Sequence, residues 1–172
     1  MATVTTALSL TVQSTALGTS SGFGSTPADQ VVAAITDALA TGTGLDQADL
    51  YYAPAAYTIT TGADQDIDLS SAALNGIGQT VAFVKIKCIV IYNTTVTAGY
   101  EIKVGGAPSN PFISWLMASG DGVKVGPDGI LLLWNPSLAG YATAAGASDI
   151  LRINNPNAGS VIVKVFVIGT TA

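Results

Sequence analysis

The chain has 172 residues and a net charge of −5, from six Lys or Arg and eleven Asp or Glu, with no histidine and one cysteine. Charged residues make up 10% of the sequence and hydrophobic residues 49%, whereas an ordinary domain has about 25% charged residues. The apolar runs are shorter than the about 18 residues that a membrane helix needs, and the basic residues are too scattered to neutralise a run of phosphates. We therefore expect neither membrane nor nucleic acid as a partner, and a surface covered in part by other chains.

The first 25 residues are rich in Thr, Ser, Gly and Ala and are predicted to form an arm that is ordered only where it packs on something. Residues 18–25 are predicted to be a linker. Residues 1–6 contain no basic residue and no compact apolar stretch, so we expect no secretory signal and synthesis in a cytoplasm. Within residues 3–14 the apolar side chains fall on even positions, as in an extended strand: Val4, Leu8, Leu10 and Val12.

One short helix is predicted over residues 27–40. Ser25 or Thr26 would cap it, and Pro27 suits the first helical position. Apolar residues recur at every fourth position and would form one narrow stripe, so the helix is expected to lie on a surface. The stripe consists of Val31, Ile35 and Leu39. Together with the arm, this helix would make up an N-terminal region of residues 1–56.

From residue 57 the pattern changes to short strands separated by Gly, Pro and Asn. The long first strand, residues 80–93, is predicted to bury its even positions, with Lys85 and Lys87 in the solvated middle of its other face. Strands at intervals of about 10–15 residues, without a β–α–β rhythm, predict a mainly β fold, with an antiparallel β-sandwich or jelly-roll-like domain over residues 57–172. The other predicted strands are 100–104, 123–125, 130–134, 150–153 and 160–169, and 112–118 is predicted to be a strand or a bend.

The usual catalytic residues are missing. The absence of histidine removes the commonest general base and the commonest zinc ligand. Cys88 lies in an apolar run, where a buried, inert thiol is expected. The acids Asp121, Asp128 and Asp149 lie at turns or strand entries and are interpreted as solvated. The sequence therefore predicts no enzyme, no catalytic residues and no cofactor.

Three aspartates have the spacing of the first three ligands of an EF-hand loop: Asp64, Asp66 and Asp68. The match then fails, because Leu69 stands at the glycine position and Asn75 at the position of the terminal glutamate. We therefore expect no metal site here and interpret the three carboxylates as the solvated face of a strand.

The aromatic residues leave two interpretations open. Three tyrosines cluster where the two regions meet, and Trp115 and Trp134 lie in the β region. Exposed, they could bind sugar; buried, they would belong to the core or to contacts between subunits, which is the interpretation we favour. The candidate subunit contacts are Val4, Leu8, Leu10, Val12, Tyr51, Tyr52 and Tyr57.

A series of strand and turn phrases runs through about residues 60–172: 63–69, 84–94, 102–106, 126–133, 149–155 and 165–169. Their order resembles that of small β-rich structural proteins of tailed bacteriophages, of the kind that decorate or cement capsids. The resemblance implies a non-enzymatic component of the virion, and it carries over no functional residue.

The leading hypothesis is therefore a capsid decoration (cement) protein on the surface of the virion, which stabilises a phage head through contacts between subunits. We expect a homo-oligomer, with a trimer as the first expectation, and the major capsid protein or other virion proteins as partners. Two alternatives stay open: a phage tail, fibre or head–tail accessory protein, and a carbohydrate-binding module or host-surface adhesin.

Overall fold

The computed structural model describes residues 4–17, 28–71, 73–75, 78 and 80–172. Over these residues the regular structure is entirely β, and none of it is a helix that could cross a membrane. The strands are β1 (Thr6–Leu17), β2 (Ala28–Thr41), β3 (Gln47–Ala48), β4 (Leu50–Tyr52), β5 (Tyr57–Ile59), β6 (Asp64–Asp68), β7 (Ala73–Leu74), β8 (Thr80–Val81), β9 (Lys85–Asn93), β10 (Ile102–Gly105), β11 (Gly122–Val125), β12 (Ile130–Trp134), β13 (Tyr141–Ala142), β14 (Ile150–Asn154) and β15 (Val161–Thr170).

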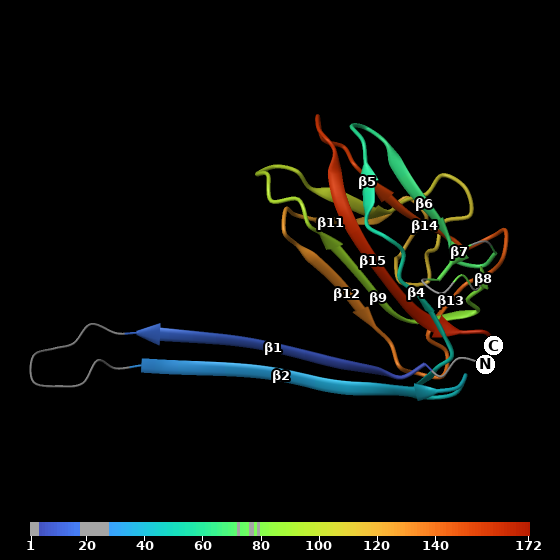
Figure 1. The fold of residues 1–172 in the computed structure, drawn as a ribbon, viewed down its shortest axis with the longest axis horizontal. Coiled ribbons are helices and arrows are strands. Elements are labelled where there is room, and N and C mark those ends of the chain that lie inside the picture. The colour runs from blue at the N-terminus through green and yellow to red at the C-terminus, as the bar shows by residue number, and fades with distance from the viewer. Residues whose placement is uncertain (1–3, 18–27, 72, 76–77, 79) are drawn as a thin grey trace, which may run out of the picture.

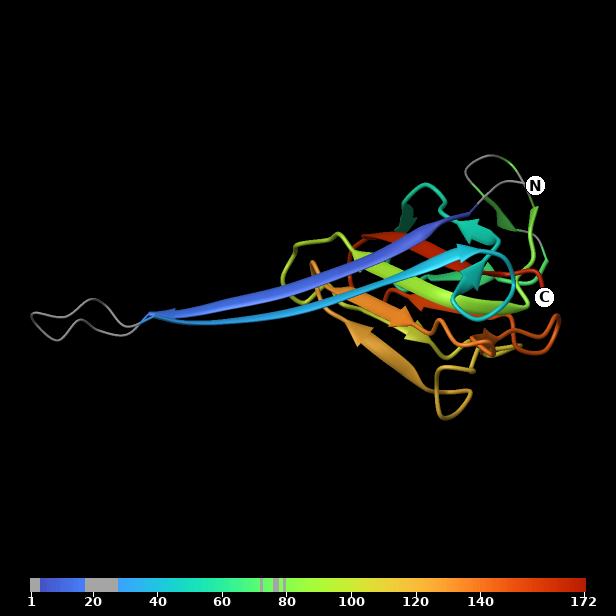
Figure 2. The same cartoon turned by 90° about the horizontal axis from the view of Figure 1, so that it is seen from below.

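The N-terminal part is a long antiparallel hairpin, which we call the arm. Its strands β1 and β2 pair over 12 residues each, from Thr6 opposite Leu39 to Leu17 opposite Ala28. At about 3.4 Å per residue, the paired stretch is about 40 Å long. The arm touches the rest of the molecule at one end only and then runs beyond it (Figures 1 and 2).

The prediction of a helix over residues 27–40 is wrong, because the described part of this stretch, residues 28–40, lies in the strand β2. Residues spaced by four all have the same parity, so the stripe Val31, Ile35 and Leu39 fits one face of a strand as well as one face of a helix. Pairing with β1 along its whole length, together with β-branched residues at 31, 32, 35 and 36, favours the strand. The predicted capping residues 25–27 and the predicted linker 18–25 lie outside the described residues.

β3 pairs in parallel with the end of β2, and the strands after it form two larger sheets and one small pair. The four-stranded sheet has the order β11–β10–β14–β6, and the six-stranded sheet contains β12–β9–β15–β4 with β13 beside β9 and β5 beside β15. Every pairing in these two sheets is antiparallel. β4 precedes residue 57, so the six-stranded sheet draws one strand from the predicted N-terminal region.

One hydrophobic core cluster takes side chains from both large sheets. β15 contributes Val161, Val163, Val165 and Val167, and β10 contributes Ile102 and Val104, all at alternate positions and all buried. This alternation is the one predicted for residues 100–104 and 160–169, because each strand offers one face to the core. Residues 112–118 form turns and bends, of which Phe112 reaches the core.

The prediction for residues 80–93 is wrong in two respects. Only residues 85–93 form the long strand, and the residues of it that enter the core are Ile86, at an even position as predicted, and Ile89 and Ile91, at odd positions. Lys87, predicted to be solvated, is fully buried, and its ammonium donates hydrogen bonds to the carbonyls of Ser137 and Pro136. A register shift opposite Ile168 and Gly169 separates the two ends of the strand, so parity does not assign Lys87 to a solvated face.

We expect the stability of the protein to rise with alkaline pH because of Lys87. Burial, with a contribution from Lys85 and against an opposing one from Asp46, lowers the pKa of the Lys87 ammonium. Between that lowered value and the unfolded value of about 10.4, the unfolded chain binds more protons, so the free energy of unfolding increases as pH rises. The measurement is urea unfolding of the wild type and of Lys87→Met from pH 7 to 10.5, and the gain in the free energy of unfolding should appear in the wild type alone. Ionisation of the tyrosines affects both proteins alike and cancels in the comparison. An equal change of the free energy of unfolding with pH in the two proteins would contradict the prediction.

Two fully buried asparagines fasten loops to the core. Asn155 Nδ2 donates to the carbonyls of Ile59, Thr60 and Gly159 at 2.9–3.0 Å, and its Oδ1 accepts from the backbone and side chain of Asn157. Asn93 joins the backbones of Tyr100, Gly126 and Thr95 in the same manner. Because buried polar groups must be satisfied, these amides fix the geometry of the loops that they connect.

Candidate assembly surface

The two faces of the arm differ in polarity. Residues that lie opposite each other in an antiparallel pair share a face, so the register places one set of residues on each side of the hairpin. The first set, which we call the apolar face of the arm, includes Leu8, Leu10, Val12, Val31, Ala33, Ile35 and Leu39, with Thr6, Ser14 and Asp37 among them. The second set, which we call the polar face, includes Ser9, Thr11, Gln13, Thr15, Gln30 and Thr36, with Val32 and the small residues Ala7, Ala34 and Ala38 among them.

The base of the arm is held on the six-stranded sheet through its apolar face. Leu39 is buried in a cluster with Ala48, Cys88 and Ile168. Next to it, the indole N–H of Trp134 donates to Asp37 at 2.7 Å. Within the hairpin itself, the hydroxyl of Thr41 donates to the carbonyl of Val4 at 2.7 Å and joins the two chain segments at its base. The contacts of Leu39 and Asp37 fix the direction in which the arm leaves the body.

Beyond Asp37 the apolar face of the arm has no cover from its own chain. Leu10 is 40% exposed, Val12 59%, Val31 60% and Ile35 57%. Single exposed apolar residues are ordinary, but a contiguous row of them on one face marks a surface that binds something. The arm is therefore an amphipathic ribbon whose apolar face is buried at the base and open towards the tip.

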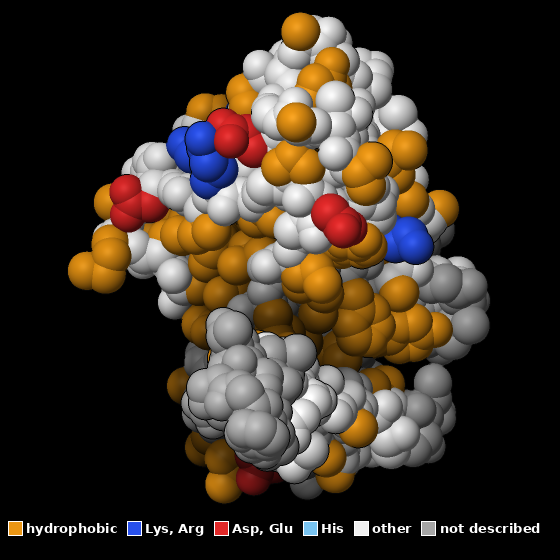
Figure 3. Space-filling view, turned by 90° about the vertical axis from the view of Figure 1, so that its left-hand side faces the viewer, with side chains coloured by type: hydrophobic (Ala, Val, Ile, Leu, Met, Phe, Trp, Pro, Cys, Tyr) orange, Lys and Arg blue, Asp and Glu red, His pale blue; other side chains and the backbone are white. Residues whose placement is uncertain are grey.

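The six-stranded sheet is apolar on both faces. Its outer face, which points away from the hydrophobic core cluster, is apolar over most of β9, β12 and β15, with Lys164 among these positions. These positions are Cys88, Val90, Tyr92, Ile130, Leu132, Trp134, Ile162, Phe166 and Ile168. The base of the arm covers this face only in part, and Ile130 is 64% exposed. Hydrophobic side chains accordingly gather in the hollow between the arm and the sheet (Figure 3).

A groove lies on this outer face beside the arm. It has a volume of about 370 Å³ and lies between the loop of Pro54 and Ala56 and the strands β9 and β15, lined there by Val90, Tyr92, Lys164, Val165 and Phe166. Phe166 also lines a neighbouring hollow of about 220 Å³ with Val4 and Tyr51. The groove therefore continues the apolar surface on which the base of the arm is seated.

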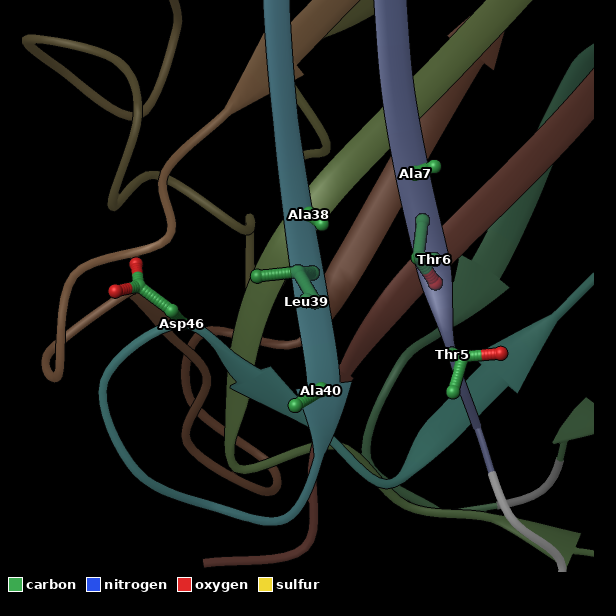
Figure 4. A pocket seen from close by; sticks show the side chains of 7 residues that line it. All are labelled: Thr5, Thr6, Ala7, Ala38, Leu39, Ala40 and Asp46. Carbon is green, nitrogen blue, oxygen red and sulfur yellow. The ribbon is translucent and has the colours of Figure 1, made fainter.

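A further hollow, of about 590 Å³, lies at the base of the arm (Figure 4). Its lining consists of residues 5–7 on the β1 side, residues 38–40 of β2, and Asp46 from the loop after β2. Asp46 is the one titratable side chain among them. This lining offers no pair of acid and base groups, and we attach no chemistry to it.

The predicted subunit contacts fall into two groups. Leu8, Leu10 and Val12 lie on the apolar face of the arm, whereas Val4 is buried at its base and Tyr51 is half-buried beside the cluster around Leu39. Tyr52 and Tyr57 instead belong to the core of their own chain, where Tyr52 is buried and the two hydroxyls share a hydrogen bond. Burial, followed by this contact with Tyr52, raises the pKa of Tyr57 above its ordinary value. The arm thus carries the part of the prediction that faces outwards.

The three aspartates with EF-hand spacing lie on β6 and have partners within the chain. Arg152 of the neighbouring strand β14 contacts Asp66 through two nitrogens and Asp64 through a third, each at 2.7 Å. Asp68 accepts from Ser70 and Ser71. Burial alone would raise the pKa of Asp68, but the hydrogen bonds from Ser71 and Ser70 outweigh it and lower the pKa. The local sequence gave no sign of Arg152, which is 86 residues away from Asp66.

The two tryptophans use their indole N–H groups inside the chain. Trp134 donates to Asp37, and Trp115 donates to the carbonyl of Phe112 at 3.1 Å. Both indoles are half-buried and pack against core clusters. Their polar groups are thus engaged in holding the fold, including the base of the arm.

No protein-family model, curated protein or solved structure matches this chain. The surface formed by the arm and the outer face is therefore interpreted from its own geometry.

The reactivity of the Cys88 thiol can be used to test whether the base of the arm packs on the six-stranded sheet. It is buried beside Leu39, and burial raises the pKa of its thiol to about 11. Since the thiolate is the reactive form, we expect the native protein to resist thiol reagents near pH 8. Leu39→Asp should unseat the arm and speed labelling by at least about tenfold, because a buried charge without a partner is costly. Val32→Asp, on the polar face, is the control; the same labelling rate in both variants would contradict this role of Leu39.

Proposed function

We propose that this protein is a non-enzymatic structural component of a tailed-bacteriophage particle, a decoration protein that binds the capsid surface and stabilises the head. The observation that carries the proposal is the arm, with an apolar face that its own chain leaves open beyond Asp37. A low content of charge and the resemblance of residues 60–172 to capsid-decorating proteins support it.

We also infer that the two large sheets pack face to face as a β-sandwich. A single core cluster that takes side chains from the four-stranded and the six-stranded sheet supports this arrangement. A sandwich with one bare outer face suits a subunit, because the bare face and the arm can be buried against neighbours.

The proposed mechanism is linkage between binding and assembly. A protein that binds the assembled shell and not the free capsid subunits shifts the equilibrium towards the shell. The arm would supply this selectivity, because an extended ribbon about 40 Å long can contact two neighbouring subunits at once. The expected partners are the major capsid protein and other copies of this chain.

The test is binding to particles that lack this protein. We expect the purified chain to co-sediment with such particles and to raise the temperature at which they release DNA. Ile35→Asp, on the apolar face, should abolish both effects, whereas Thr36→Asp, on the polar face, should keep them. Absence of binding by the wild type would contradict the proposal. A handful of copies per virion, in place of hundreds, would instead favour a tail or head–tail protein over a decoration protein.

A further inference from the structure

We propose that the open apolar face of the arm is buried in the groove on the outer sheet face of a second copy of this chain, so that each copy gives an arm and accepts one. This inference rests on the proposed function in one respect: that function requires a partner that covers the arm, and the inference names a second copy of the chain as this partner.

The first reason is continuity with a contact that the chain already makes. At the base, the apolar face of the arm packs on the outer face of the six-stranded sheet through Leu39. The arm then diverges, so its outer part and the rest of that sheet face are both left open (Figures 1 and 3). The apolar face of the arm and the outer face of the sheet are thus complementary where they touch and exposed elsewhere. A second copy has the same two surfaces, so its sheet face can bury the exposed part of this arm, and its arm can bury the exposed part of this sheet face.

The second reason is the area. Nine residue pairs lie beyond Leu8 and Asp37. At about 3.4 Å per residue and about 10 Å for the width of two strands, one face of this ribbon covers about 300 Å². A standard interface buries about 800 Å² on each partner. One arm in one groove falls well short of that value, whereas a copy that gives an arm and accepts another buries about twice as much and approaches it.

The experiment is the molar mass of the full chain in solution, without particles, by size-exclusion chromatography with light scattering over a range of concentrations. Two matched pairs of variants test the two surfaces. Val31→Asp and Val32→Asp change neighbouring valines of similar exposure, 60% and 55%, on opposite faces of the arm. Ala56→Arg and Ala55→Arg change neighbouring exposed alanines, of which Ala56 lines the groove.

We expect the wild type to form a closed oligomer of two or three copies, and Val31→Asp and Ala56→Arg to weaken it at least about a hundredfold in dissociation constant, which a buried charge without a partner accounts for. Val32→Asp and Ala55→Arg should keep the oligomer. Slow labelling of Cys88 in each variant shows that the arm base and the fold are intact.

A monomeric wild type at about 100 μM would overturn the inference. So would equal effects of Val31→Asp and Val32→Asp, or an oligomer that dissociates with Val31→Asp and persists with Ala56→Arg. If the variants affect the oligomer as expected but the wild type fails to bind particles, the inference stands and only the proposed function is contradicted.

Discussion

Asn155→Asp is expected to cost more than about 4 kcal/mol of stability and to unfold much of the protein at neutral pH, because it puts an unpaired charge in a buried site. The wild-type amide points its N–H₂ group at three carbonyl oxygens, of Ile59, Thr60 and Gly159, in a site that water does not reach. The carboxylate has the same shape but no donor, so three acceptors would face a negative oxygen.

The sign of the pH dependence makes this prediction specific. Repulsion by the carbonyls and burial would both raise the folded pKa of the introduced carboxyl above its unfolded value of about 3.9. The variant should therefore be least impaired at acidic pH and should lose stability as pH rises through that raised value.

Urea unfolding of the variant and the wild type between pH 4 and 7 measures the effect. Asn135→Asp is the matched control, since Asn135 uses its Oδ1 to accept from the backbone and hydroxyl of Ser137 and donates no side-chain hydrogen bond among the described residues. It should change stability by less than about 1 kcal/mol. Similar losses in both variants would show that the buried carbonyls around Asn155 are not the cause.

Gly169→Ala is expected to cost about 3 kcal/mol or more, because the added methyl group has no room. A Cβ on Gly169 would collide with the carbonyl oxygen of Lys85 and come within 2.7 Å of Phe83 Cδ1. The position lies at the register shift between β15 and β9, where the two backbones approach closely. Since Lys85 also pairs with Ala142 of β13, its backbone is held from both sides and cannot retreat.

Thermal unfolding measures this loss, with Gly120→Ala as the control. No atom lies within 4 Å of a Cβ built on Gly120, so this variant should unfold at the wild-type temperature. A Gly169→Ala protein that unfolds at the wild-type temperature would mean that the strands can separate at the shift without loss of stability.

The sequence predicted the strands of the body well where alternation and turns coincide. Residues 130–134 form β12 as predicted, because a short apolar run is bounded by Gly129 and Pro136. The helix over 27–40 failed because a spacing of four residues does not distinguish helix from strand, and only the register with β1 decides. The prediction that Lys87 is solvated failed because a register shift between β9 and the distant strand β15 changes which side of β9 faces solvent.

The sequence predicted one part of the candidate surface, the apolar face of the first arm strand, and missed the rest. The even positions of residues 3–14 indicated an apolar strand face, and Leu10 and Val12 indeed lie exposed on it. The partner strand was missed, and so were the groove and the outer sheet face. Alternation within β15 shows Val163 and Phe166 on opposite sides, but both are apolar, so the sequence alone does not say which side belongs to the core and which stays open.

The position of β15 has a consequence for how the molecule is made. It follows the other strands of its sheet along the chain, yet it lies between β9 on one side and β4 and β5 on the other. During synthesis the arm can close as soon as its two strands have emerged, because a hairpin is a local structure. The six-stranded sheet must wait for the final strand, and until then the edge of β9 and its apolar side chains stand unpaired. Each nascent chain therefore presents a finished arm to its neighbours before it has a finished body.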